Sequence, residues 1–341
     1  MRAAIHQGHQ GLTGLEITEI PEPVPGPGQV TVRIRAAGLN HRDLFLMDTR
    51  GTGDPALVPG SDGAGVVTAT GSGVTGVREG DEVVVNPTLN WERAADVPAV
   101  PDILGGPSDG TLAETLLIPA AQAHPKPPHL TWRQAAALPL SAVTAYRALF
   151  TRGGLRPGEH VLIPGIGGGV ATFALSLAKA AGARVTVTSR QADKRAGALA
   201  LGADRALESG SDWRAELGGD PVDLALDGVG PAVFQRYSEV VRPGGRVVSF
   251  GATSGDEVRL PLRSLFFPQH ALLGTSMGSA EEFRDMLAFV DRHRIVPVVD
   301  GAHPLAGVVG AYERMAAGRQ FGKIVVEVAD PARGVGGAQR A

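Results

Sequence analysis

The chain has 341 residues, of which 43% are hydrophobic and 20% are charged, with a formal net charge of -3. This length favours two domains of ordinary globular composition, and the charge gives no basis for binding nucleic acid or an anionic membrane surface. Cysteine is absent, which excludes disulfides, thiolate zinc sites and a cysteine nucleophile. Because no apolar run is long enough to span a bilayer and the N-terminus shows no signal peptide, we expect a cytoplasmic protein without membrane contacts.

The first third of the chain has the pattern of β-strands. Residues 30–36 alternate apolar and polar side chains, as expected of a strand with one buried face. Residues 63–70 and 82–85 are predicted as further strands, joined by a turn at 79–81. Segment 86–110 has no clear period and contains four prolines, so we expect an irregular surface lobe there.

Beyond residue 126, short apolar strands alternate with helical patterns, and such repeated βα units imply a parallel, doubly wound sheet. The tail at 331–341 is rich in Gly, Ala and Arg and is expected to be disordered. Strands are predicted at 161–163, 185–188, 222–226, 247–250, 272–275 and 323–328, with a turn at 242–245 and with helices at 170–181, 193–201 and 281–293.

A glycine cluster follows the strand at 161–163 and opens an apolar helical pattern. Bare backbone at such a turn can approach the pyrophosphate of a dinucleotide, which the N–H groups of the helix N-terminus then bind. The glycine pattern alone is a weak signal, but a strand before it and a helix after it provide the required context. A glycine-rich turn without a ligand is the alternative. The expected cofactor contacts here are Gly167, Gly168, Gly169 and Val170.

The residues after the next strand determine which dinucleotide is preferred. An Asp or Glu there would accept hydrogen bonds from the ribose hydroxyls and favour NAD. This chain has Ser189 and Arg190 instead, with Lys194 close behind, and cations pair with a 2′-phosphate. We therefore predict NADP(H). The alternative is that these charges belong only to a solvated start of a helix.

Several motifs follow one another in the order typical of one family, and with them the chain resembles the medium-chain dehydrogenase/reductase superfamily, in particular its zinc-free, quinone oxidoreductase-like branch. The resemblance implies a Rossmann NADP-binding domain at 126–278 and a GroES-like, β-rich catalytic domain made of 1–125 and 279–330. It also implies a homodimer through the edge strand near 271–276. The matching stretches are 36–43, 59–65, 138–146, the glycine cluster, 201–204, 227–230, 243–245 and 322–325.

The chain departs from the zinc-dependent branch of this superfamily at its metal ligands. That branch carries Cys where this chain has Asn40, and His-Glu where it has Ser61-Asp62. It carries a further ligand near Leu140 and four cysteines in the lobe that corresponds to 86–103. Because Asn, Ser and Leu do not supply the ligand set of zinc, both zinc sites are predicted to be absent. An improvised site formed by His41, Asp62 and His124 is the alternative.

Without zinc, the hydride acceptor must already be activated by conjugation, as in a quinone, enone, enal or enoyl thioester. The protein then has to orient the acceptor and donate a hydrogen bond to its carbonyl oxygen. We therefore predict an NADPH-dependent, zinc-independent reductase of a small molecule. Two other functions stay open: an alcohol dehydrogenase with an unrecognised metal site, and a non-catalytic NADPH-binding protein.

The resemblance also implies roles for individual residues. Asn40 would face the substrate oxygen, or would only cap a turn, and Asp43 would orient the same loop. Asp62 is the carboxylate expected near the reaction, with a salt bridge as its alternative. Phe45 replaces a tyrosine of many relatives and would form an apolar substrate wall with Trp91 and Phe266 or Phe267, for which core packing is the alternative. Further cofactor contacts are expected from His41, Thr144, Asp227, Gly251, Ser276 and Lys323.

Overall fold

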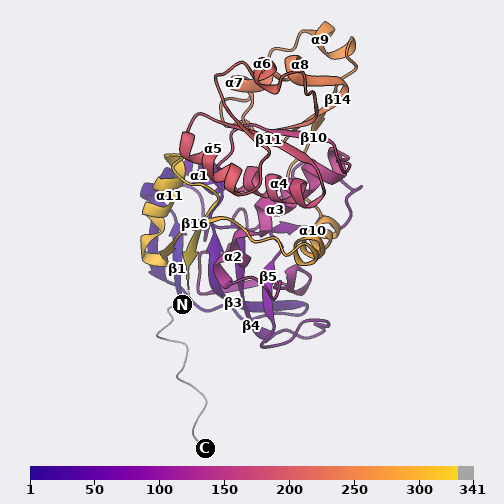
Figure 1. The fold of residues 1–341 in the computed structure, drawn as a ribbon. Helices are drawn as coiled ribbons and strands as arrows, with labels where there is room; N and C mark the ends of the chain where they lie inside the picture. The colour runs from indigo at the N-terminus through magenta and orange to yellow at the C-terminus, as the bar shows by residue number, and fades with distance from the viewer. Residues whose placement is uncertain (329–341) are drawn as a thin grey trace, which may run out of the picture. The chain divides into compact units, whose positions relative to one another are not determined.

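The computed structural model describes residues 1–328, which form two compact units (Figure 1). Of the described residues, unit 1 contains 1–90, 102–140 and 299–328, and unit 2 contains 91–101 and 141–298. The tail predicted at 331–341 lies outside the described residues. No helix within residues 1–328 combines the length and the apolar character that crossing a membrane requires.

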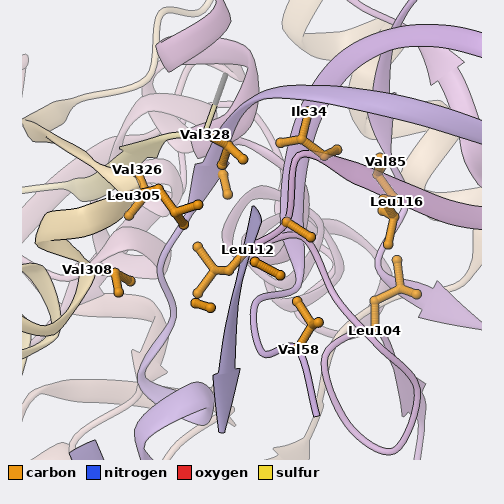
Figure 2. Packing of buried hydrophobic residues seen from close by; sticks show 14 of the residues in the cluster. Ile34, Val58, Val85, Leu104, Leu112, Leu116, Leu305, Val308, Val326 and Val328 are labelled. Atoms are coloured by element: carbon orange, nitrogen blue, oxygen red, sulfur yellow. The ribbon is translucent and has the colours of Figure 1, made fainter. Parts of the chain in front are cut away.

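Unit 1 is built on a seven-stranded sheet in which β16, β17, β3, β4, β5 and β9 lie side by side and β8 also pairs with β3. Strand β3 (Gln29–Gly38) buries Val30, Val32 and Ile34 completely, as the predicted alternation requires, although Thr31, expected on the exposed face, is buried as well. Figure 2 shows that all three segments of unit 1 contribute to one apolar cluster. The other elements are β1 (Arg2–His6), β2 (Leu15–Glu19), α1 (His41–Thr49), β4 (Asp62–Thr70), β5 (Glu82–Val85), β6 (Thr88–Leu89), β7 (Asp102–Ile103), β8 (Thr115–Pro119), β9 (Ala123–Pro125), α2 (Trp132–Ala137), β16 (Val299–Pro304), α11 (Val308–Ala316) and β17 (Lys323–Glu327).

Unit 2 contains a six-stranded parallel sheet in the order β12-β11-β10-β13-β14-β15. The order reverses between β10 and β13, which confirms the predicted doubly wound sheet. Helices α4 and α5 pack on β10, β11 and β12 (Figure 1). The elements are α3 (Pro139–Tyr146), a π-helix (Arg147–Arg152), β10 (His160–Ile163), α4 (Gly169–Ala180), β11 (Arg184–Ser189), α5 (Ala192–Ala200), β12 (Arg205–Glu208), α6 (Trp213–Leu217), β13 (Val222–Asp227), α7 (Pro231–Phe234), α8 (Tyr237–Val240), β14 (Val241–Ser249), α9 (Leu262–Phe266), β15 (Ala271–Gly274) and α10 (Ala280–Arg292).

The units differ from the expected domains in three stretches of the chain. Residues 126–140 belong to unit 1, because α2 packs on β3 and β4 with its alanines buried. Residues 91–101 and 279–298 belong to unit 2, where the backbone N–H of Ala280 donates to the carbonyl of Trp91 at 2.8 Å. Residues 242–245, expected as a turn, lie within β14 but interrupt its pairing with β13, which passes from Val241 to Arg246, and Gly244 there has a φ of 70°.

Candidate functional site

The glycine cluster forms the turn between β10 and α4. Gly165 and Gly167 adopt positive φ angles of 68° and 135°, which disfavour other residues. Gly168 is the N-cap of α4, so no side chain caps the first N–H groups of this helix. A Cβ added at Gly168 would meet no atom within 4 Å. Open space therefore lies beside the start of a 12-residue helix, whose first N–H groups suit an anion. This turn fits the pyrophosphate of a dinucleotide, and Gly169 and Val170 begin the helix behind it.

Lys194 lies directly over this turn. A Cβ on Gly167 would come within 2.6 Å of Lys194 Cδ and 3.0 Å of its Nζ, although Lys194 belongs to α5 and is only 9% exposed. Ser189 ends β11 and accepts a hydrogen bond from the Gln191 N–H, while Arg190 is exposed. The structure thus places an ammonium group at the glycine turn and a guanidinium group after β11.

Two further loops at the carboxyl ends of the strands hold residues predicted to contact the cofactor. Asp227 ends β13, is fully buried, and accepts hydrogen bonds from the N–H groups of Val229 and Gly230 at 2.8 and 2.9 Å. Burial raises the pKa of Asp227. A Cβ on Gly251 would lie 3.1 Å from the Gly228 carbonyl oxygen. Oδ1 of Asp227 therefore shapes its own turn, and Gly251 allows two loops to approach closely. Both residues stay predictions as cofactor contacts.

The other predicted contacts of unit 2 are placed as follows. Thr144 is buried in α3, and Ser276 is exposed just beyond β15. Both stay predictions as cofactor contacts. Trp91 is 3% exposed, and the guanidinium of Arg147 lies 4.8 Å from the centre of its ring, so Trp91 is packed within unit 2 instead of lining a substrate wall. Phe266 and Phe267 are 55% and 71% exposed. The alternative that these two side chains pack in the core is therefore wrong.

In unit 1, Asn40 and Lys323 meet in a buried polar cluster. The Lys323 ammonium donates to the Leu39 carbonyl at 2.7 Å, to Asn40 Oδ1 at 2.6 Å and to Asp62 Oδ2 at 2.8 Å. An ammonium has three hydrogens, and all three are donated here. This arrangement differs from the expected contact between Lys323 and the cofactor, because Lys323 is 3% exposed and its ammonium donates to the Asn40 turn and Asp62.

Asp62 is the carboxylate of this cluster and is fully buried at the start of β4. Its Oδ2 accepts from Asn40 Nδ2 at 3.0 Å as well as from Lys323, and its Oδ1 accepts from the Leu140 N–H at 2.7 Å. We expected a catalytic role for Asp62, with a salt bridge or loop hydrogen bond as the alternative. The structure shows the alternative: Asp62 forms a salt bridge with Lys323 and accepts hydrogen bonds from the loop.

Ser61 lies beside this cluster and is bound by a second cation. Its Oγ accepts from Arg42 Nη1 at 2.9 Å and donates to the Leu104 carbonyl at 3.0 Å. Ammonium and guanidinium groups therefore contact the polar atoms of Asn40, Ser61 and Asp62. Among residues 1–328, no three His, Cys, Asp or Glu side chains gather as a metal-ligand set, so the improvised site with the exposed His41 and with His124 of β9 does not assemble.

Asp43 is fully buried and contacts the backbone of the Asn40 turn. Its Oδ2 accepts from the Asn40 backbone N–H at 2.9 Å and from the Tyr312 hydroxyl at 3.1 Å. Burial raises the pKa of Asp43 from 3.8 to about 6. These contacts agree with the expected orienting role. His41 and Phe45 lie on the exposed face of α1, and Phe45 is 60% exposed.

Sequence reasoning did not identify Arg42 and Tyr312 as parts of the site, and it assigned Lys323 to another partner. Lys323 Nζ and Asn40 Oδ1 are separated by 283 positions in the chain, and Tyr312 and Asp43 by 269. The motif that contains Lys323 was visible in the sequence, but no local pattern tells which oxygen atoms a lysine meets.

Comparison with known proteins agrees with this architecture. Residues 26–128 match the family described as "Alcohol dehydrogenase GroES-like domain", and residues 169–292 match that described as "Zinc-binding dehydrogenase". The chain is 32% identical to the zinc-type alcohol dehydrogenase-like protein YogA of Leptosphaeria maculans, over 94% of this chain and 97% of the relative. It is 29% identical to crotonyl-CoA reductase of Streptomyces avermitilis, over 94% of this chain and 84% of that protein.

A crystal structure of an NAD-dependent alcohol dehydrogenase superposes with a TM-score of 0.91, at 37% identity, and covers 96% of this chain and 100% of that one. The GroES-like match falls within unit 1 except for residues 91–101, and the dehydrogenase match falls within unit 2. On these grounds the chain belongs to the medium-chain dehydrogenase/reductase superfamily and is an oxidoreductase that uses a nicotinamide cofactor.

Proposed function

We propose that this protein is an NADPH-dependent, zinc-independent reductase that transfers hydride to a conjugated acceptor, a quinone or an α,β-unsaturated carbonyl or enoyl compound. The observation that carries the proposal is the contact of two cations, Lys323 and Arg42, with the polar atoms of Asn40, Ser61 and Asp62. Interconversion of simple alcohols and carbonyls would need a Lewis acid at the Asn40, Ser61 and Asp62 positions. The two cations at these positions repel a divalent metal ion.

A conjugated acceptor needs only a hydrogen-bond donor at its carbonyl oxygen, where negative charge develops. A bound nicotinamide supplies the hydride. In this proposal the side-chain amide of Asn40 donates to that oxygen, and the charge of Lys323 lies 2.6 Å behind the amide oxygen. Asp43 and Tyr312 hold the backbone from which the amide projects.

The cofactor preference rests on the residues around the glycine turn and β11. Arg190 is exposed at the end of β11, and Lys194 lies over Gly167. We expect Arg190→Asp to weaken NADPH binding by about tenfold or more and to leave NADH binding nearly unchanged. Arg214→Asp, at an exposed position on α6, is the charge-matched control. Unchanged discrimination in Arg190→Asp would refute the NADPH assignment.

The test of the reaction is a panel of quinones, enals, enones and enoyl thioesters offered with NADPH. Crotonyl-CoA, on which the Streptomyces relative is named, is a conjugated enoyl thioester and supports this acceptor class. The cysteine-free composition agrees with an enzyme of the cytoplasm. NADPH oxidation at the background rate with every acceptor would contradict the proposal, and tight NADPH binding without turnover would favour a non-catalytic binding protein.

An alcohol dehydrogenase with a bound metal is the second candidate, favoured by the match to the NAD-dependent alcohol dehydrogenase at 37% identity. It predicts oxidation of aliphatic alcohols that a chelator abolishes, and about one zinc ion per chain after purification. Elemental analysis and the chelator assay on the same preparation decide between the two candidates.

A further inference from the structure

We infer that Lys323 is a positioning residue whose ammonium fixes the side-chain amide of Asn40 in one orientation and polarises it. The inference rests on the proposed function for its catalytic meaning, but its geometry can be tested independently. Lys323 and Asn40 are 3% and 6% exposed, so the contact between them is largely screened from water.

The two ends of the Asn40 amide meet groups of opposite character. Oδ1 accepts from the Lys323 ammonium at 2.6 Å, and Nδ2 donates to Asp62 Oδ2 at 3.0 Å. A flipped amide would turn its N–H groups toward the ammonium and its oxygen toward the carboxylate. Both contacts would then be repulsive, so the buried ion pair of Lys323 and Asp62, 2.8 Å apart, permits one orientation only.

The backbone of Asn40 is held as firmly as its side chain. Its N–H donates to Asp43 Oδ2 at 2.9 Å, its carbonyl accepts from the Asp43 N–H at 3.0 Å, and Tyr312 donates to the same carboxylate. Capping a helix requires a single accepted hydrogen bond, whereas this asparagine also has a buried cation and two buried carboxylates around it. Such support is what a group needs when its exact placement matters for binding or catalysis.

The charge of Lys323 also changes what the amide can do. A cation on the amide oxygen withdraws electron density from the nitrogen and strengthens its N–H groups as donors, because hydrogen bonds in series polarise one another. For an acceptor whose carbonyl oxygen gains negative charge, a stronger and preoriented donor lowers the barrier more than it tightens ground-state binding. The positioning role therefore predicts an effect on kcat rather than on KM.

The first test is spectroscopic and uses the full-length wild type. In ¹⁵N NMR, assigned through loss of the signal in Asn40→Ser, the Asn40 side-chain amide is expected to show slow hydrogen exchange and one bound orientation. Fast exchange with averaged signals would overturn the inference without reference to any activity. This readout stands even if the wild type reduces no acceptor, a result that would refute the proposed function alone.

The second test compares Lys323→Met/Asp62→Asn with wild type. The double variant removes both charges of the pair, because a buried carboxylate without its cation would destabilise the fold. Circular dichroism checks that the variant is folded. We expect kcat to fall by about tenfold to a hundredfold, with KM and NADPH affinity near wild type, and the Asn40 amide to exchange quickly. Lys126→Met is the matched control, since Lys126 is also largely buried in unit 1 and paired with Glu82 at 3.2 Å. Wild-type kcat and slow exchange in a folded double variant would overturn the inference.

Discussion

Arg147 Nη1 lies 2.7 Å from both carboxylate oxygens of Glu282, and the two side chains are 4% and 3% exposed. The pair joins the π-helix after α3 to the first turn of α10. Glu282 also accepts from the backbone N–H and hydroxyl of Ser279, and the Arg147 guanidinium lies on Trp91. Three separate segments of unit 2 therefore meet at one buried charge pair.

Removing only the cation of this pair is expected to be costly. Arg147→Met leaves Glu282 buried without its partner, and we expect the free energy of unfolding to fall by about 3–5 kcal/mol. Arg147→Met/Glu282→Gln should recover most of that loss. Urea denaturation measures both. Arg133→Met, which breaks an exposed pair with Glu327, is the control and should leave stability nearly unchanged. A loss that small in Arg147→Met would show that the pair is not buried in solution.

The raised pKa of Asp43 predicts how stability varies with pH. Between 3.8 and about 6 the folded protein keeps a proton on Asp43 that the unfolded chain has released, so Asp43 lowers stability progressively as pH rises through this range. The gap corresponds to about 3 kcal/mol. Relative to wild type, Asp43→Asn should therefore gain about that much stability between pH 4 and pH 7. Urea denaturation at intervals across this range tests the sign, and a difference that does not change with pH would contradict it.

The glycine turn separates an effect on folding from an effect on cofactor binding. In Gly168→Ala the added methyl group meets nothing within 4 Å, so we expect a thermal midpoint close to wild type. Because the methyl group enters the space proposed for pyrophosphate, NADPH affinity should fall by about tenfold or more.

Gly167→Ala is the informative companion variant. Its methyl group would strike Lys194 Cδ at 2.6 Å and its φ of 135° is strained for alanine, so it should lose stability as well. Thermal denaturation and NADPH titration by fluorescence separate the two variants. Unaltered NADPH affinity in Gly168→Ala would place the cofactor elsewhere.

We also propose that the protein forms a homodimer through β15, which ends the strand order of the unit 2 sheet and pairs with β14 on its other side. Leu272 on this strand is 40% exposed. A lysine on an edge strand disfavours pairing with a second sheet. Leu272→Lys is therefore expected to convert a dimer to a monomer in sedimentation velocity runs, while Leu199→Lys, at an exposed position on α5, should not. A monomeric wild type would refute the proposal.

The strands with long buried apolar runs could be predicted from periodicity, because such runs leave distinct patterns, whereas β1, β2, β8, β9, β16 and most of the helices were not predicted. Strand β5 was placed at 82–85 and β10 within one residue of its start. Strand β12 was missed since Arg205–Glu208 buries only Leu207 and leaves its two ends exposed. A short edge strand without an apolar run has the same sequence pattern as a loop.

One part of the candidate site could be predicted from the sequence and another part could not. The glycine turn was predictable because its backbone conformation demands glycine, as Gly167 shows. Asp43 was predicted to orient the Asn40 turn, but the contacts of Asn40 with Asp62 and Lys323 were not predicted, because these residues reach it from β4 and β17. Sequence shows which charges exist, but the pairing of buried charges follows from tertiary packing.

Unit 1 receives Tyr312 and Lys323 from a segment that follows the whole of unit 2 in the chain. During synthesis the ribosome therefore releases every strand of the unit 2 sheet before Tyr312 and Lys323 emerge. Unit 2 can fold first, while unit 1 is still incomplete and Asp43 and Asp62 lack their contacts with Tyr312 and Lys323. A nascent chain arrested before residue 299 should accordingly carry a folded dinucleotide unit beside a protease-sensitive N-terminal portion.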